Sequence, residues 1–307
     1  MTRPKPRMIG ADHPGAERYA ALVEERYNLG TLRGMTAADF LAAVEPFASR
    51  AAYDRWAAVY RANVGTFLDH PVWGADRRIG PGAYLHGAMD DRFASNAARL
   101  FGAPAGLRHE HVAGKACALV GAWDGTEALL LHALGARRVV CVEEVPDFAA
   151  MARTQLRAWQ VPGEVRTCSL YEIDPTEDEW WQAFDLVYVP GVLYHLTDLP
   201  LAAVILWSML RPGGAVAIES IADPPGPCSA RYLGAAVPGW NWWAPTCTAY
   251  EALLRDAGFP DARTAEYSRG RGWWCGTRGE RLPALESAAA GFSRPDLLRR
   301  IRGLVAR

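Results

Sequence analysis

The sequence predicts an α/β fold in which helices cover both faces of a mostly parallel sheet. From about residue 115 onward, short apolar runs alternate with segments of helical periodicity, and such alternation requires crossover connections between parallel strands. A glycine turn over residues 121–125 follows the first apolar run, and Glu143 and Glu144 close the second. Because ligands of open α/β sheets bind at the carboxyl ends of the strands, these residues also predict a ligand site at that edge.

The predicted strands are short and apolar, as strands buried between two helical layers are. They span residues 116–120, 138–142, 164–167, 183–189, 215–219, 262–268 and 272–277. Helices are predicted over residues 127–134, 148–159, 199–210, 248–258 and 294–305. The sequence RPGG at residues 211–214 is predicted to be a turn.

The remaining segments differ in composition from this core. Residues 1–17 predict a loose tail, residues 18–68 and 89–108 predict helices, and the Gly- and Pro-rich residues 69–88 predict a loop that covers the site. The Pro-, Gly- and Trp-rich residues 222–247 predict an inserted lid. We therefore expect an N-terminal extension and covering segment over residues 1–110, a ligand-binding catalytic domain over 111–280 and a helical tail over 281–307.

Composition and residue spacing favour some classes of function over others. The formal net charge is −1, so nucleic acid is not the default partner. The six cysteines lack CxxC spacing and form no Cys/His cluster, so no metal site is predicted. No secretory signal or apolar run long enough for a membrane span is present, so we expect a cytoplasmic protein without membrane contact.

The turn and the acid after the second strand predict a nucleoside site. Gly121 and Gly125 allow a ligand to approach the backbone, and Glu143 can accept hydrogen bonds from both ribose hydroxyls. Asp124 and Glu127 place negative charge where a dinucleotide would have its pyrophosphate. Acids there favour a ligand that is cationic at this point, such as the sulfonium and ammonium groups of S-adenosylmethionine. The alternative is an ordinary strand–helix turn with solvated acids.

With these motifs the sequence resembles the class I methyltransferases, which have a Rossmann-like fold. The motifs general to that class are VGAWDG at residues 120–125 and LRPGG at 210–214. Two others, GVLYH at 191–195 and WWAPT at 242–246, are similar to the family of the tRNA wobble-uridine carboxymethyltransferase and its small-molecule biosynthetic relatives. The resemblance covers roughly residues 70–280.

The resemblance implies a seven-stranded sheet whose last strand is antiparallel, and it implies a set of cofactor-binding residues. The set comprises Gly121, Ala122, Trp123, Asp124 and Gly125 at the turn, Glu143 and Glu144 at the ribose, Ser169 and Leu170 at the adenine, and Pro190 and Val192 along the pocket. Tyr194 would lie near the transferred group.

Further candidates concern catalysis and the substrate. His195 at the ligand edge is a candidate general base, or alternatively it caps the following turn. Trp242 and Trp243 in the lid are candidates to hold a flat or cationic substrate, or alternatively they are packing anchors. By the resemblance, Arg231 and Tyr232 contact substrate or cofactor.

The sequence thus predicts an S-adenosylmethionine-dependent methyltransferase that acts on a small molecule in specialised biosynthesis. The tRNA enzyme transfers carboxymethyl and uses a basic Trp-Arg-Lys-Gly-Pro segment, whereas residues 76–81 here read DRRIGP and lack the lysine, which favours plain methyl transfer. Three alternatives stay open: a lyase or cyclase that releases methylthioadenosine, a tRNA wobble-uridine (carboxy)methyltransferase, and a non-catalytic nucleoside-binding protein. The oligomeric state, a homo-oligomer included, also stays open.

Overall fold

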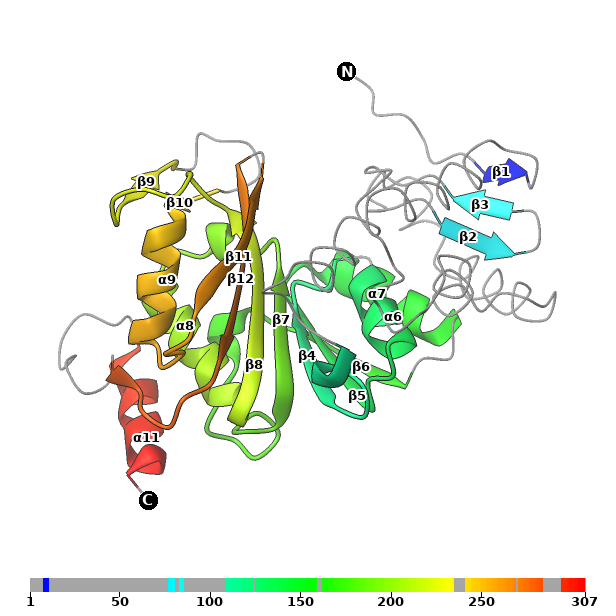
Figure 1. Ribbon diagram of the computed structural model, residues 1–307. Helices are drawn as coiled ribbons and strands as arrows, with labels where there is room; N and C mark the ends of the chain where they lie inside the picture. Colours follow the sequence, from blue (N-terminus) through cyan, green and yellow to red (C-terminus); the bar gives the residue numbers. More distant parts are fainter. Residues whose placement is uncertain are drawn as a thin grey trace. The chain divides into compact units, whose positions relative to one another are not determined.

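The computed structural model (Figure 1) describes three short N-terminal strands and residues 109–123, 125–158, 162–234, 241–268, 270–283 and 294–306. The short strands β1 (Met8–Gly10), β2 (Arg77–Gly80) and β3 (Ala83–Leu85) form an antiparallel sheet in the order β1-β3-β2. The segments predicted as a loose tail and a covering loop therefore contain strands. The helices predicted over residues 18–68 and 89–108 lie outside the described residues.

The predicted seven-stranded, mostly parallel sheet is confirmed. Its order is β11-β12-β8-β7-β4-β5-β6. The strands are β4 (Ala116–Val120), β5 (Arg138–Glu143), β6 (Gly163–Thr167), β7 (Phe184–Pro190), β8 (Leu210–Ile221), β11 (Arg263–Ser268) and β12 (Arg271–Thr277). The last strand, β12, is antiparallel to both β8 and β11, whereas β4 pairs with β7, β5 with β6 and β7 with β8 in parallel.

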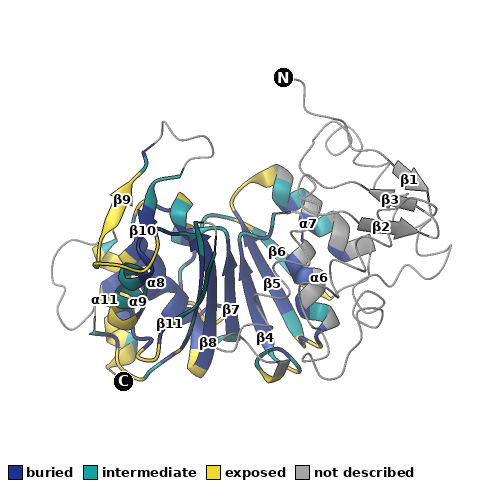
Figure 2. Ribbon diagram, turned by 45° about the horizontal axis from the view of Figure 1, so that its top comes forward, coloured by how far each residue is buried: buried dark blue, intermediate teal, exposed yellow. Residues whose placement is uncertain are grey.

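Central strands of this sheet are buried on both faces (Figure 2). Every residue of β4 is buried, and every residue of β7 except Asp185 is buried. The Asp185 carboxylate accepts a hydrogen bond from the backbone N–H of Ala116 at 2.8 Å and pairs with Arg211 at 3.0 Å. The continuous apolar runs in the sequence therefore reflect strands covered on both faces rather than strands with one wet face.

One compact unit comprises residues 109–114 and 122–167. It contains the short helix η2 (His109–His111), strands β5 and β6, and helices α6 (Thr126–Ala133) and α7 (Pro146–Ala158). The turn before α6 lies against α7, because a Cβ atom at Gly125 would lie 3.1 Å from Cα of Ala152. Gly125 has a φ of +82°, so both its conformation and this close approach favour glycine.

The second unit comprises residues 115–121 and 168–306. Its helices are η3 (Leu170–Glu172), η4 (Leu193–His195), α8 (Leu199–Met209), α9 (Cys247–Asp256) and α11 (Pro295–Val305). Helix α8 is almost wholly buried and begins at Asp198, whose side chain accepts a hydrogen bond from the backbone N–H of Leu201 at 3.0 Å. Figure 1 shows α8 and α9 on the same side of β8.

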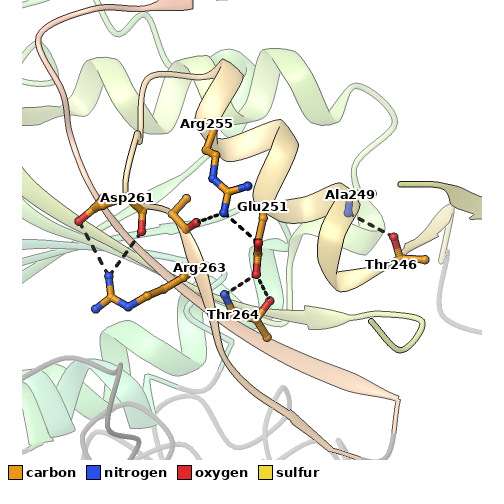
Figure 3. A network of polar contacts seen from close by, with 8 residues as sticks. Thr246, Ala249, Glu251, Arg255, Asp261, Arg263 and Thr264 are labelled. Carbon is orange, nitrogen blue, oxygen red and sulfur yellow. Dashed lines mark hydrogen bonds and ion pairs between the residues drawn. The ribbon is translucent and has the colours of Figure 1, made fainter. Parts of the chain in front are cut away.

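Helix α9 and strand β11 are joined by a polar network (Figure 3). The Glu251 carboxylate accepts hydrogen bonds from the backbone N–H of Thr264 at 2.9 Å and from its hydroxyl at 2.7 Å. Arg255 donates both to Glu251 and to the carbonyl of Ala262, each at 2.9 Å. These bonds fix the helix on the edge strand of the sheet.

One sequence prediction differs from the structure in this unit. Residues 211–214, predicted to be a turn, lie within β8, and the β7–β8 register shifts between the pairs Phe184/Leu210 and Leu186/Ala215. The segment is therefore an irregularity within a strand. The predicted lid over residues 222–247 contains the hairpin of β9 (Ala230–Tyr232) and β10 (Trp243–Pro245).

Among the helices that the structure describes, none has the length and apolar character of a membrane span.

Candidate functional site

Glycines follow strands β4 and β7 where backbone and side chains approach closely. Gly121 has a φ of +78°, and a Cβ atom there would lie 2.2 Å from Cγ2 of Val192. Gly191 has a φ of +70°, and a Cβ atom there would lie 3.5 Å both from Oε2 of Glu219 and from the hydroxyl of Tyr194. At Gly121 both the conformation and the collision with Val192 require glycine, whereas at Gly191 only the positive φ favours it. The structure thus brings together two predicted pocket residues, Gly121 and Val192.

Glu143 lies at the end of β5 with only 6% of its surface exposed. One carboxylate oxygen accepts the backbone N–H of Trp123 at 2.8 Å, and the other accepts that of Val145 at 3.0 Å. Burial raises the pKa of Glu143, and the two backbone hydrogen bonds partly oppose this rise. Each oxygen has a second lone pair, so a carboxylate oriented in this way fits the predicted role of accepting ribose hydroxyls.

The turn before α6 differs from the alternative of an ordinary turn with solvated acids. Trp123 has a φ of +43°, which is rare for a residue with a side chain, and its ring lies 6.0 Å from that of Phe148. Glu127 is only 1% exposed, so it is not a solvated acid. Burial, followed by the charges of Glu143 and Glu127, raises the pKa of Cys141 to about 12. Ala122 is buried, Glu144 is exposed, and Asp124 lies outside the described residues.

The residues predicted to face adenine begin the short helix η3. Ser169 caps it: its hydroxyl accepts the backbone N–H of Tyr171 at 3.4 Å, and its own N–H donates to the Glu172 carboxylate at 2.7 Å. Leu170 is buried. The capping box explains the local sequence, and contact of Ser169 and Leu170 with adenine stays a prediction.

Tyr171 connects this helix to the start of α8, a role that the sequence did not predict. Its hydroxyl lies 2.8 Å from both the backbone carbonyl and the backbone N–H of Asp198. From the C-terminal segment, Arg294 donates to the carbonyl of Tyr171, and Arg300 pairs with Asp174. The η3 turn is thus held by two distant parts of the chain.

The predicted catalytic pair lies on η4, directly after β7 and Gly191. The rings of Tyr194 and His195 are 4.0 Å apart, and His195 is exposed whereas Tyr194 is half-buried. The guanidinium carbon of Arg271 lies 5.1 Å from the centre of the Tyr194 ring. The turn therefore presents an ionisable imidazole and a phenol beside a cation.

That cation belongs to an ion pair that the sequence did not reveal. Arg271 on β12 binds both carboxylate oxygens of Glu219 on β8, and the contact from its Nη2 is 2.7 Å. Burial lowers the pKa of Arg271, but its hydrogen bond and its attraction to Glu219 outweigh burial, and Tyr194 adds to them, so the pKa stays above its ordinary value. Glu219 lies two residues before the end of β8, and the pairing of β8 with β12 brings Arg271 to it.

The four predicted substrate residues gather on the β9–β10 hairpin. The Tyr232 ring lies 5.3 Å from that of Trp243 and 6.4 Å from that of Trp242. Arg231 forms two hydrogen bonds with Asp223, which lower the pKa of that carboxyl. The backbone N–H of Trp242 donates to the carbonyl of Tyr194 at 2.7 Å, so the hairpin is attached to the η4 turn.

Within the described part of the chain, no group of three or more His, Cys, Asp or Glu residues could hold a metal ion. Two ion pairs, Glu219 with Arg271 and Asp223 with Arg231, lie in the same unit as η4. The arrangement can orient a small molecule and accept a proton from it.

Comparison with known proteins identifies the domain. A family model described as a methyltransferase domain matches residues 119–218, which run from β4 into β8. This match confirms the predicted enzyme class, a methyltransferase, and the predicted cofactor, S-adenosylmethionine. The narrower likeness to the tRNA wobble-uridine family stays a prediction. A search of curated proteins finds no match to this chain.

Two of the solved structures that are similar to this chain are as follows. The N-terminal domain of EvdMO1, in the presence of SAH and D-fucose, is 14% identical with a TM-score of 0.55, and the match covers 72% of this chain and 96% of that one. An S-adenosylmethionine-dependent methyltransferase from Mesorhizobium loti is 16% identical with a TM-score of 0.47, over 55% of this chain and 93% of that one. At this identity, the likeness to EvdMO1 shows the fold.

Proposed function

We propose that this methyltransferase transfers the methyl group of S-adenosylmethionine to a small-molecule acceptor in specialised metabolite biosynthesis. The observation that carries the proposal is the hydrogen bond from Trp242 to Tyr194, which joins an aromatic hairpin to the turn after β7. Aromatic walls with a few polar groups are typical of small-molecule sites. EvdMO1, which shares the fold, was crystallised in the presence of a sugar, and this supports an acceptor of similar size.

The proposed cofactor residues are those predicted from the sequence. They are Gly121, Ala122, Trp123, Asp124 and Gly125 for the methionine end, Glu143 and Glu144 for the ribose, Ser169 and Leu170 for the adenine, and Pro190 and Val192 for the wall. Two observations support this assignment: the buried Glu143 is oriented by backbone N–H groups, and Gly121 leaves no space for a side chain.

When bound, the cofactor supplies a methyl group activated on a sulfonium sulfur. Residues that align the acceptor with this methyl group would supply much of the rate. Tyr194 orients the acceptor through its hydroxyl. His195 accepts the acceptor's proton where the nucleophile is a hydroxyl or an amine.

Product analysis tests this function. The full chain is incubated with S-adenosylmethionine and a panel of small hydroxyl- and amine-bearing acceptors, and the nucleoside products are quantified by mass spectrometry. We expect S-adenosylhomocysteine that forms only when an acceptor is present, together with an acceptor heavier by one methylene. Methylthioadenosine would indicate the lyase or cyclase alternative, and tight cofactor binding without turnover of any acceptor would indicate a nucleoside-binding protein. Either result would contradict the proposal.

A further inference from the structure

We infer that Tyr232, Trp242 and Trp243, here called the aromatic cluster, select an uncharged ring-shaped acceptor, either an aryl ring or a sugar ring with an apolar face. This inference rests on the proposed function and deepens it, because it names the class of acceptor. Three features of the hairpin carry it: the exposure and packing of its rings, the pairing of its charge, and its attachment to the η4 turn.

The rings pack together, with Tyr232 exposed and Trp242 and Trp243 half-buried. Tyr232 and Trp243 are directly opposite in the β9–β10 register, so their side chains lie on the same face. Tyr232 is 62% exposed, which is unusual for a large aromatic residue that already contacts two other rings. The indole N–H of Trp243 donates to the carbonyl of Thr197 at 3.3 Å, which fixes the ring and uses its donor. Trp243 therefore offers its ring face rather than a hydrogen-bonding group.

Charge is nearly absent from this part of the chain. Between Asp223 and Glu251 the sequence has one charged residue, Arg231. Two of its nitrogens bind the two carboxylate oxygens of Asp223, at 2.6 and 3.0 Å, so the charge is compensated in place. The nearby cation Arg271 is likewise paired with Glu219. A charged acceptor would therefore lose hydration without gaining an unpaired counter-charge from these side chains, whereas an uncharged ring loses little.

The hairpin is also attached to the proposed catalytic turn. The backbone N–H of Trp242 donates to the Tyr194 carbonyl at 2.7 Å, and the Trp243 indole donates to Thr197, so the two bonds lie on either side of His195 in the sequence. A ring on the aromatic cluster would thus be held by a segment whose position is fixed relative to Tyr194 and His195. Binding of a ring to the aromatic cluster would therefore also align the acceptor with Tyr194 and His195.

The test uses the full chain saturated with S-adenosylhomocysteine and calorimetric titration with ring probes that differ in charge. The probes are p-cresol, 4-hydroxybenzoate and tyramine, which share a phenol ring but are neutral, anionic and cationic, together with methyl β-D-glucopyranoside as a neutral sugar. We expect p-cresol or the glucoside to bind at least about five-fold more tightly than either charged probe. A ring contact is worth roughly 0.5–1.5 kcal/mol, so Tyr232→Ala should weaken that binding about 2–10-fold. Tyr232→Phe should keep it.

A second variant tests the role of charge pairing. Asp223→Asn leaves Arg231 without its carboxylate, so we expect it to strengthen 4-hydroxybenzoate binding several-fold. Asp178→Asn, at an exposed position away from the hairpin sequence, should leave the preference unchanged.

Three results would overturn the inference. They are binding of a charged probe to the unaltered chain that is as tight as that of a neutral probe or tighter, absence of binding by both neutral probes, and a Tyr232→Ala variant that binds normally. Concentration-dependent dimerisation that Tyr232→Ala removes would also overturn it, because a second copy would then occupy the surface.

The same titrations separate this inference from the proposed function. Affinity for S-adenosylhomocysteine is measured first in each protein. Intact cofactor binding with no ring preference contradicts only the aromatic cluster's role. Failure of the chain to bind S-adenosylhomocysteine contradicts the proposed function itself.

Discussion

At the scale of single residues, Gly121 has the most constrained backbone position in the site. A Cβ atom there would lie 2.2 Å from Val192, and the residue has a φ of +78°. Gly121→Ala should destabilise the fold by at least about 2 kcal/mol, because the strain of the positive φ and the collision with Val192 add. Gly213→Ala is the matched control, since Gly213 also has a positive φ but nothing within 4 Å of its Cβ position, so it should cost only about 1 kcal/mol.

Urea unfolding measures both variants. The double variant Gly121→Ala/Val192→Ala should recover part of the loss, because it removes the side chain that the new methyl group would meet. Equal losses at the two glycines would show that the collision contributes nothing.

Glu143 carries the prediction for cofactor affinity. Glu143→Gln should weaken S-adenosylhomocysteine binding about 10–100-fold, since a charged hydrogen-bond acceptor is replaced by a neutral amide. Burial raises the pKa of Glu143, so the protein should lose cofactor affinity as pH falls through that raised value, and the Gln variant should lose this dependence. A raised carboxyl pKa means that the folded state favours the protonated form, so Glu143 by itself adds stability as pH falls while affinity drops.

Calorimetry at several pH values, paired with urea unfolding, separates affinity from stability. Glu164→Gln, at a half-buried position on β6 that pairs with Arg138 and Arg166, is the control and should keep full affinity. The ribose role would be refuted by a Glu143→Gln variant that binds the nucleoside as tightly as the unaltered chain.

At the scale of elements, the attachment of α9 to β11 depends on Glu251. Burial raises the pKa of this carboxyl, but hydrogen bonds from Thr264 and then from Arg255 outweigh burial and lower it. The stabilisation is therefore present above the ordinary Glu range and is lost as pH falls through the lowered pKa. Glu251→Gln should cost about 1 kcal/mol at pH 7, and the difference from the unaltered chain should shrink below about pH 4.

Chemical denaturation at pH 7 and at acid pH measures this difference. Glu280→Gln, an exposed position, should change stability little at either pH. A cost of Glu251→Gln that is the same at both pH values would mean that ionisation of Glu251 does not stabilise the helix on the strand.

At the scale of the whole molecule, charge argues against nucleic acid as the acceptor. The chain has 33 basic and 34 acidic residues. Many of the described arginines are paired with carboxylates, namely Arg138, Arg166, Arg211, Arg231, Arg255, Arg263, Arg271 and Arg300. Phosphate backbones bind through uncompensated cations. We therefore expect no salt-sensitive binding of tRNA by fluorescence anisotropy, and affinity that falls steeply with salt would instead favour the tRNA alternative.

The sequence by itself determined the sheet, the order of its elements along the chain and the cofactor. Strand–turn–helix signals are local: the apolar run, Gly121, Gly125 and Glu143 lie within one contiguous segment, so their chemistry can be interpreted without knowing the fold. The local pattern misled at RPGG, which was predicted to be a turn but lies within β8, where the register with β7 shifts.

Only the tertiary structure decided which distant side chains meet near the η4 turn. Glu219 and Arg271 are 52 residues apart, and Tyr171 and Asp198 are 27 apart, so strand pairing and helix packing bring them together rather than any motif. The same holds for the bond from Trp242 to Tyr194. Contacts between separate elements depend on register and packing, which sequence periodicity does not specify. The cofactor was therefore predictable from a short segment, whereas the acceptor surface became visible only when the chain was folded.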